Sequence, residues 1–389
     1  MSHPSTLTSY SPTVAEVDLG ALQENVRAIK GFTDKSRLMA VIKTNAYGHG
    51  IVPVGHAAVQ GGADCLGVTT VEEGALLRED GIDVPIHILS SIMSERARDA
   101  VTYDLTASVS SLGLANALSR EAVRQEKTHP VHLKIDTGLH RFGIQPEKTI
   151  EFCRSAYDLP GLEWEGIYTH FSSADEGEWE TTEEQFALFM KTIATLAEHG
   201  YYFPIRHAGA STIAIERKDM HLDMVRTGIA LFGYPPERRQ ISMISLKPVM
   251  ELKSRIIHVR ELPPDTPVGY GGTYVTRGYE KIAVVPIGHG DGYHRALSNN
   301  GEMLVHGKRA GIIGEVSLDQ TLIDVTGIPD VNEGDEVILM GTQAGDSISA
   351  REVAGWMGSI VDEVLAGLKE RVERKYKDVY NYDKYLKIK

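Results

Sequence analysis

The feature that most limits how this chain can fold is a regular alternation of short apolar runs with amphipathic segments between residues 15 and 235. Eight of the runs are rich in β-branched residues and have the length of strands. They are residues 39–43, 65–70, 85–89, 105–110, 131–136, 166–171, 205–211 and 226–232. Segments with helical spacing lie between them, for example residues 18–30, 71–79, 112–124 and 183–199. This pattern predicts a (β/α)8 barrel, and periodicity alone leaves an open doubly wound sheet as the alternative.

The pattern changes after about Pro235. Further strands, separated by Gly, Pro and Asp turns, are predicted at residues 247–259, 281–287, 302–305, 309–313, 321–325 and 336–340. Helical spacing returns only at residues 349–356 and 359–369. We therefore expect an α/β chain of two domains, a TIM barrel at residues 1–240 and a mostly β domain at residues 241–389.

Composition excludes several functional classes. A net charge of −13 argues against a nucleic-acid partner, which would require a basic face. The sequence has neither an apolar run long enough to cross a membrane nor a signal peptide, which argues against a membrane partner. The two cysteines, Cys65 and Cys153, match no metal motif and no disulfide framework. We expect a reduced, cytoplasmic protein that binds a small molecule and no metal.

A lysine ends the first predicted strand, within the string AVIKTNAYGHG at residues 40–50. A lysine at the end of a buried strand is costly unless it is paired or functional. At the C-terminal end of a barrel strand, Lys43 would face the rim that carries the active site in barrel enzymes. Desolvation there would suit its amine to Schiff-base formation. The alternative is a lysine that simply reaches solvent.

The complete string resembles the cofactor-lysine signature of the alanine racemases, AVVKANAYGHG, and differs from it only at Ile42 and Thr44. The resemblance continues from about Val17 to Tyr376. It implies an enzyme that uses pyridoxal 5'-phosphate (PLP), of fold type III, with a (β/α)8 barrel followed by a β domain. It also implies that Lys43 and Tyr47 bind the cofactor, and that two chains form a homodimer with shared active sites.

A second motif, HLKIDTGLHR, covers residues 132–141. Period-two alternation places His132, Lys134 and Asp136 on one face of a strand, and in a barrel that face can line the mouth of the lumen. The alternative is that Lys134 and Asp136 pair with each other and only satisfy a partly buried strand. By resemblance, Arg141 binds the substrate carboxylate and the phenolic oxygen of the cofactor. Lys134 stands where some family members carry an N-carboxylated lysine, which would orient Arg141.

A third group of residues lies near the ends of the last strands. Ser211, Gly228 and Ile229 occupy the region where barrels commonly bind phosphate. By resemblance, Arg226 bonds the pyridine nitrogen of the cofactor and His170 braces Arg226, although a lone histidine at a strand end is more often structural. Because a guanidinium cannot take up a proton, it leaves the ring a weaker electron sink, which suits racemisation better than transamination.

A fourth motif, VGYGGTY at residues 268–274, lies in the predicted β domain. Considered alone, a tyrosine in a glycine-rich turn is usually a packing residue. By resemblance, Tyr270 reaches the partner's cofactor and removes the proton from the L-enantiomer, while Lys43 serves the D-enantiomer. Racemisation needs an acid–base group on each face of the reacting carbon. The resemblance also assigns substrate binding to the segment at Leu318 and Asp319.

Four positions depart from the family pattern. Ala210 replaces an asparagine, His289 replaces a tyrosine of the access corridor, and Glu315 replaces an arginine. Glu370 stands where a phosphate-binding tyrosine is expected, and a carboxylate would repel a phosphate. Either Glu370 points away, the chain path differs, or the corridor takes another substrate. Neutral drift is the simpler interpretation, and a corridor that admits cationic amino acids is the alternative.

Together these observations predict a PLP-dependent amino-acid racemase, an isomerase that interconverts L- and D-alanine by a two-base mechanism. By resemblance it would supply D-alanine for peptidoglycan. A racemase of broader or different specificity, for serine or basic amino acids, is the alternative enzyme. A decarboxylase on a related barrel would have no use for Tyr270. A PLP-carrying protein without turnover would resemble the barrel alone.

Overall fold

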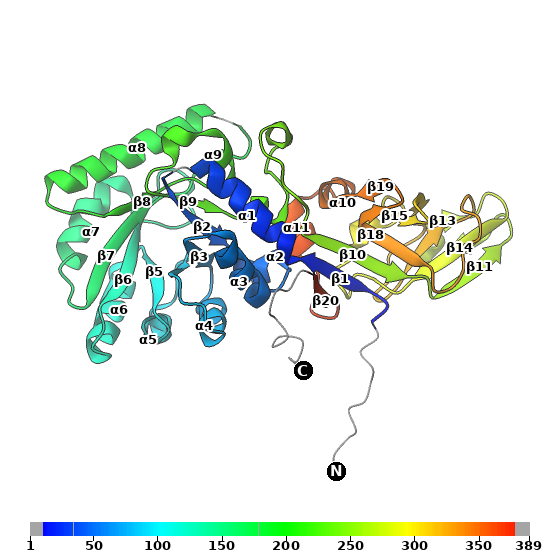
Figure 1. The fold of residues 1–389 in the computed structure, drawn as a ribbon, viewed down its shortest axis with the longest axis horizontal. Coiled ribbons are helices and arrows are strands. Elements are labelled where there is room, and N and C mark those ends of the chain that lie inside the picture. The colour runs from blue at the N-terminus through cyan, green and yellow to red at the C-terminus, as the bar shows by residue number, and fades with distance from the viewer. Residues whose placement is uncertain (1–10, 34, 178, 378–389) are drawn as a thin grey trace, which may run out of the picture. The chain divides into compact units, whose positions relative to one another are not determined.

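The computed structural model describes residues 11–33, 35–177 and 179–377. Within these ranges the chain forms two compact units (Figure 1). The barrel unit spans Leu19–Pro248, and the β unit combines the residues up to Asp18 with those from Val249 onward. The observed division thus differs from the predicted one at residue 240, because the boundary lies after Pro248 and the first strand belongs to the second unit.

Parallel strands form the inner layer of the barrel unit, in the order β8-β7-β6-β5-β4-β3-β2-β9. Their bounds are β2 Arg37–Val41, β3 Cys65–Val68, β4 Ile86–Ile88, β5 Leu105–Val109, β6 His129–Lys134, β7 Leu162–Tyr168, β8 Ile205–His207 and β9 Met224–Thr227. Two backbone hydrogen bonds link the end strands, from the Asp223 N–H to the Arg206 oxygen and from the Arg226 N–H to the Gly209 oxygen, each 3.0 Å. The sheet is therefore a nearly closed barrel, which confirms the predicted fold over the open-sheet alternative.

Helices surround these strands on the outside of the barrel unit (Figure 1). They are α1 Leu19–Thr33, α3 Ile51–Gly61, α4 Val71–Glu79, α5 Ala97–Thr102, α6 Leu112–Arg124, α7 Thr149–Ala156, α8 Trp179–Glu198 and α9 Ser211–Glu216. The side chains of Thr70 and Ser111 cap the N-termini of α4 and α6 by accepting backbone N–H groups. β3 and β5 are buried along their whole length, which explains the continuous apolar sequence of β3. No helix within the described residues has both the length and the apolar composition of a membrane span.

The β unit consists mainly of sheets, as predicted. Its largest sheet has the order β16-β15-β18-β10-β1-β20, with β19 beside β18. The strands of this sheet are β1 Val14–Asp18, β10 Met250–Arg255, β15 Glu302–Val305, β16 Lys308–Gly311, β18 Glu336–Gln343, β19 Asp346–Ile348 and β20 Glu373–Lys377. The other strands are β11 His258–Leu262, β14 Glu280–Val285 and β17 Thr321–Asp324, which form a second sheet, and the hairpin of β12 Pro267–Val268 and β13 Tyr274–Val275. Two helices, α10 Ala350–Met357 and α11 Val361–Ala366, complete the unit.

The first described strand, β1, lies inside this sheet, between β10 and the edge strand β20. It pairs antiparallel with β10 and parallel with β20. Its residues Ala15 and Val17 are fully buried. On the other face, Glu16 forms ion pairs with Lys253 on β10, at 2.8 Å, and with Lys377 on β20, at 2.6 Å. The first and the last strands described are thus neighbours in one sheet.

Candidate active site

Lys43 follows β2 but does not extend it. The strand ends at Val41, and Lys43, which is half-buried, begins the turn α2 (Lys43–Tyr47). The four residues from Thr44 to Tyr47 have φ between 50° and 56°, which is the left-handed helical region. This conformation costs roughly 1–2 kcal/mol for each residue that has a Cβ. The prediction of a strand that reaches Lys43 was therefore wrong, and the candidate lysine starts a strained turn of the kind found at functional sites.

Hydrogen bonds around the turn offset this cost. The Asn45 backbone N–H donates to Glu73 Oε1 at 3.1 Å, and Asn45 Oδ1 accepts the Ile51 N–H at 2.8 Å. Gly48 continues the turn with φ 81° and donates its N–H to the Thr44 oxygen at 3.1 Å. These bonds attach the turn to α3 and α4, so the position of Lys43 is fixed by neighbouring helices as well as by its own strand.

Tyr47 ends the turn with its hydroxyl against Gly228. A Cβ at position 228 would lie 2.4 Å from Tyr47 Oη, so only glycine fits there without displacement. The Gly228 N–H donates to Ser211 Oγ at 3.2 Å, and Ser211 is buried at the start of α9. Ile229 follows as the first residue of the 3-10 turn η4 (Ile229–Phe232). The structure therefore brings together the residues that were predicted to hold a phosphate.

Arg226 lies inside the barrel on β9, and 4% of its surface is exposed. Its guanidinium donates to Nδ1 of His207 and to Nδ1 of His170, each at 3.0 Å, and to the carbonyl oxygens of Thr169 and Ala208, at 3.0 and 2.8 Å. Burial lowers the pKa of Arg226 to about 10, so the group is still a cation at neutral pH. Burial and the charge of Arg226 hold the pKa of His170 and His207 well below its usual value, so both are neutral acceptors.

Lys134 on β6 is one of the largest fully buried side chains, with 1% of its surface exposed. Its Nζ donates to the Ile135 oxygen at 2.7 Å and lies 5.3 Å from the centre of the Tyr168 ring. Within the described residues it forms no ion pair. Burial, together with the charges of Arg226 and Arg141, lowers the pKa of Lys134 to about 7. A large share of this amine is therefore neutral, and nucleophilic, near neutral pH.

Asp136 and Arg141 lie in the segment after β6. Asp136 Oδ1 accepts the backbone N–H groups of Gly138, at 3.2 Å, and His140, at 2.9 Å. It thus closes a local turn, and the alternative of a Lys134–Asp136 pair was wrong. Arg141 is exposed at the surface of the barrel unit, with its guanidinium 6.0 Å from the centre of the Phe142 ring.

The second predicted base, Tyr270, lies in the β unit. It begins the 3-10 turn η6 (Tyr270–Gly272) between β12 and β13. Tyr270 is 72% exposed and Leu318 is 55% exposed, and both line an open pocket of about 360 Å³. The other residues that line this pocket are His289, Arg295, Glu315, Val316 and Ser317. The predicted base and the predicted carboxylate-binding segment are thus neighbours within one unit.

The charged residues around this pocket are paired. Glu315 Oε2 lies 3.1 Å from Arg295 Nε, so its carboxylate is balanced by a cation of the same pocket. Asp319 forms an ion pair of 2.9 Å with Arg371. Glu370, which precedes Arg371, is exposed. The pairing of Glu315 weakens the idea of an anionic corridor that admits cationic amino acids.

Three buried polar residues of the barrel were assigned no role from the sequence. They are His87 on β4, Ser108 on β5 and Tyr168 on β7. Ser108 Oγ lies 2.6 Å from Tyr168 Oη and 3.1 Å from His87 Nε2. A polar residue inside a fully buried strand needs a partner, and this signal was present at His87 and Ser108. The sequence did not show which residue each one contacts, because this depends on how strands that are far apart in the sequence align.

Known proteins resemble this chain over both units. The family described as alanine racemase, N-terminal domain, matches residues 17–236, and alanine racemase, C-terminal domain, matches residues 249–376. An alanine racemase of Halothermothrix orenii is 42% identical over 368 residues, which cover 94% of this chain and 97% of that protein. The alanine racemase structure from Clostridium difficile 630 has a TM-score of 0.89 at 34% identity and covers 95% of this chain and 96% of its own.

A structure of alanine racemase from Bartonella henselae with covalently bound pyridoxal phosphate has the same fold. It is 24% identical, with a TM-score of 0.85, and the match covers 95% of this chain and 100% of that one. An alanine racemase of Methanococcus maripaludis is also similar, with 40% identity over 368 residues, which cover 94% of this chain and 98% of that protein. These relatives do not favour the alternative specificity for serine or basic amino acids.

Proposed function

This chain belongs to the alanine racemase family, and on that premise we propose that it interconverts L- and D-alanine with PLP bound in the barrel unit. The proposed role is the supply of D-alanine for peptidoglycan, and the proposed place of action is the cytoplasm. The observation that carries the proposal is the group formed by Tyr47, Ser211 and Gly228 near the strand that holds the buried Arg226. Such a group matches both ends of PLP, an anionic phosphate and a basic ring nitrogen.

The residues of the barrel unit fit PLP. The Tyr47 hydroxyl, the Ser211 hydroxyl and the N–H groups of Gly228 and Ile229 would hold the phosphate, and the missing Cβ at position 228 leaves room for this close approach. Arg226 would donate to the ring nitrogen, and the amine of Lys43 would bind the aldehyde carbon. When bound, PLP withdraws electrons from the Cα of an attached amino acid and so makes its proton acidic.

Two side chains then divide the movement of the proton. Lys43 Nζ removes or returns the Cα proton on one face, for the D-enantiomer, and Tyr270 Oη does so on the opposite face, for the L-enantiomer. Because Arg226 has donors only, it cannot accept a hydrogen bond from a protonated ring nitrogen, and it therefore favours the unprotonated ring. This limits the withdrawal of charge and favours return of the proton to Cα.

We propose that the active sites are shared in a homodimer. Tyr270 and Leu318 are 72% and 55% exposed on the β unit, as expected of residues that act in a partner. Arg141 and the backbone N–H near Leu318 and Asp319 would bind the substrate carboxylate.

Lys134 is proposed to be N-carboxylated. Its neutral amine would add to the carbon of CO2, so that an N–C bond forms as one C=O π bond opens and one amine proton leaves to water. The buried neutral amine would thereby become a carbamate anion, which the charge of Arg141 would attract. Carbon-13 NMR of the protein in labelled bicarbonate is expected to show a carbamate resonance that disappears in Lys134→Gln. The exposed Lys148→Gln variant is the matched control. A spectrum without that resonance would contradict the modification.

A direct assay tests the proposed function. The purified protein, supplied with PLP, is incubated with single L-amino acids, and the D-enantiomers are separated by chiral chromatography. L-alanine is expected to approach equal amounts of both enantiomers faster than serine, lysine or arginine. Absence of conversion for every amino acid would overturn the proposal.

The variant Tyr270→Phe tests the two-base mechanism. It is expected to lose a factor of about 10²–10⁴ in rate, because one face lacks its acid–base group, while the absorbance of bound PLP is retained. Tyr279→Phe is the matched control, since Tyr279 is 77% exposed in the same unit. Near-normal turnover of Tyr270→Phe would contradict this mechanism.

A further inference from the structure

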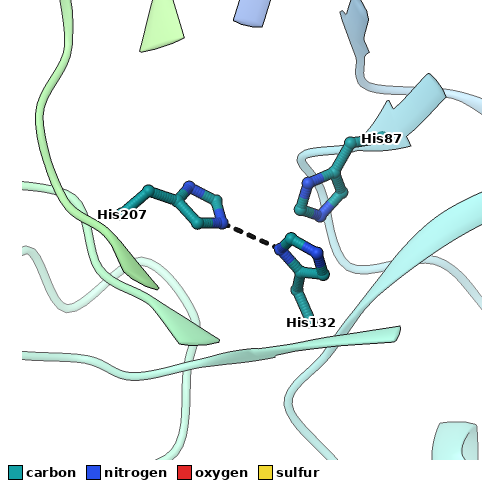
Figure 2. Close-up of side chains that lie close together, drawn as sticks. All are labelled: His87, His132 and His207. Carbon is teal, nitrogen blue, oxygen red and sulfur yellow. Dashed lines mark hydrogen bonds between the residues drawn. The ribbon is translucent and has the colours of Figure 1, made fainter. Parts of the chain in front are cut away.

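Three histidines from different strands meet inside the barrel unit (Figure 2). They are His87 on β4, His132 on β6 and His207 on β8, and each is at most 2% exposed. His207 also accepts a hydrogen bond from Arg226, so the group touches the proposed active site at one end. Such a cluster can hold a metal ion or carry a chain of hydrogen bonds. The directions of its bonds decide between the two.

Arg226 fixes these directions. A guanidinium has donors only, so His207 Nδ1, 3.0 Å away, accepts and the proton of this neutral imidazole lies on Nε2. His207 Nε2 lies 2.8 Å from His132 Nδ1, which must accept in turn (Figure 2). The proton of His132 therefore lies on Nε2, which is 3.2 Å from Glu165 Oε2. The bonds run in one direction, from Arg226 through His207 and His132 to Glu165.

The same directions argue against a metal ion. A metal binds the lone pair of an imidazole nitrogen, and the lone pairs of His132 and His207 already accept hydrogen bonds. His87 donates Nε2–H to Ser108 Oγ, because the Ser108 hydroxyl itself donates to the Ile88 oxygen at 2.6 Å. Of these three histidines, only His87 has a ring nitrogen, Nδ1, that lacks a partner among the described residues, and one ligand does not make a site.

The hydrogen-bond chain ends at the carboxylate of Glu165, which supplies the negative counter-charge that Arg226 lacks among its direct contacts. The acceptors that contact its guanidinium are two imidazoles and two carbonyls, and within the described residues it forms no ion pair. A buried cation without a counter-charge is costly. The hydrogen bond from His132 lowers the pKa of Glu165, so this group is a carboxylate. Its side chain is 31% exposed, which places the negative charge where water also stabilises it.

We propose that Glu165 and His132 are positioning residues for the reaction. They form, with His207, a directed relay that polarises two neutral imidazoles, keeps Arg226 charged and fixes the orientation of its guanidinium. The effect of the relay on catalysis rests on the proposed function, because it requires that Arg226 contacts the cofactor. The directions of its bonds are a property of the cofactor-free chain, and they can be measured without turnover.

Nitrogen-15 NMR of histidine-labelled, cofactor-free protein tests these directions, with each histidine assigned by its replacement. His132 and His207 are both expected to carry the proton on Nε2. In Glu165→Gln the His207 Nδ1 resonance is expected to move toward that of an imidazole nitrogen without a hydrogen bond. Glu163→Gln, an exposed position on the same strand, is the matched control and should move neither resonance. A proton on Nδ1 of His132 or His207 would overturn the relay. So would added zinc that shifts the nitrogen-15 resonances of His87, His132 and His207 together.

Steady-state kinetics of the PLP-loaded protein test the consequence for catalysis. Glu165→Gln is expected to lower kcat about tenfold with little change in KM, because the carboxylate acts through Arg226 and not on the substrate. Glu163→Gln should leave both constants unchanged, and thermal melts show whether each variant is folded. An unchanged kcat in Glu165→Gln would remove the positioning role. If the wild-type protein racemises nothing while the NMR directions hold, the proposed function fails and the relay stands.

Discussion

Arg226 in the barrel unit and Glu280 in the β unit are both buried charged residues, yet they find their partners over very different distances along the chain. Arg226 donates to His170, 56 residues away, and to the carbonyls of the residues that follow β7 and β8. Glu280 accepts the N–H of Arg277 and the hydroxyl of Tyr274, three and six residues away. Strands from distant parts of the chain thus satisfy this buried charge in the barrel unit, whereas a local turn satisfies the one at Glu280 in the β unit.

This difference separates two tasks. A barrel can hold a cation, a nucleophilic amine and several neutral imidazoles away from water, because strands from different parts of the chain surround each of these groups. The β unit instead presents side chains outward from short turns, as η6 does for Tyr270. The barrel is therefore suited to tune charge, and the β unit to deliver a side chain to another molecule.

The largest expected effect is on racemase activity. It tests whether each active site takes Lys43 from one copy of the chain and Tyr270 from the other. Lys43→Ala and Tyr270→Phe should each be nearly inactive, since each removes one acid–base group. When the two variants are refolded together, half of the dimers are mixed and each mixed dimer has one intact site, so about one quarter of the wild-type activity is expected. Racemase activity before and after mixing measures this. No recovery would mean that both groups come from one copy.

The next effect tests the close packing of the barrel. In Gly228→Ala the new Cβ must displace Tyr47 Oη, and overpacking of this kind costs about 1–3 kcal/mol. PLP affinity, measured by absorbance titration, is therefore expected to fall by about tenfold or more. Gly31→Ala on α1 is the control, because nothing lies within 4 Å of its Cβ. Equal affinities in the two variants would show that Tyr47 and Gly228 do not form the phosphate site.

A smaller effect should appear in acid. Burial lowers the pKa of His129 on β6 to about 4, and neither of its ring nitrogens has a partner within the described residues. The unfolded chain takes up this proton near pH 6.5, whereas the folded chain resists it. Stability is thus complete above about pH 6.5 and is lost as the pH falls toward 4, by up to about 1.4 kcal/mol per pH unit for each such histidine.

Hydrogen exchange at pH 5 and pH 7 measures this loss in each unit. The barrel unit should lose protection first, because the histidines described in the β unit are all exposed. His129→Leu should reduce the acid sensitivity of the barrel. Equal loss of protection in both units would contradict the assignment of this sensitivity to buried histidines.

The smallest effect concerns a surface cluster of the β unit. Arg309 forms ion pairs with Glu302, Asp346 and Glu352, at 2.8, 3.0 and 2.6 Å, and its side chain is 32% exposed. Exposed pairs contribute little, so Arg309→Ala is expected to lower the free energy of unfolding by about 1 kcal/mol or less. Urea unfolding measures the change. A loss several times larger would mean that this unit, too, depends on long-range charge contacts.

Elements with strong periodicity could be predicted from the sequence. The helices Val71–Glu79 and Leu112–Arg124 and the strand Glu302–Val305 have the predicted bounds. In both helices an amphipathic face coincides with a capping residue, Thr70 or Ser111, so two independent signals mark the start. The residues near Lys43, Arg226 and Tyr270 were predicted through motif resemblance, and their roles remain proposals.

Features that depend on distant partners could not be predicted. The segment predicted as one strand at residues 247–259 is two strands, because the chain changes sheets where Ile256 bonds Asp335 and Ile257 bonds Val284. The left-handed turn after Lys43 contradicts the local preferences of its residues and exists only because Glu73 and other neighbours hold it. The relay from Arg226 to Glu165 depends on the alignment of four strands, which no local pattern encodes.

The position of β1 has a consequence for the order in which the protein is made. Its neighbours in the sheet, β10 and β20, leave the ribosome long after it, and β20 is the last strand described. The barrel strands form one uninterrupted stretch of chain and can assemble as they emerge. Val14–Asp18 must meanwhile stay unpaired until β10 has been made, and its other edge stays open until β20 follows. Between the synthesis of β1 and that of β20 the nascent chain therefore carries an open strand edge, a natural target for a ribosome-associated chaperone.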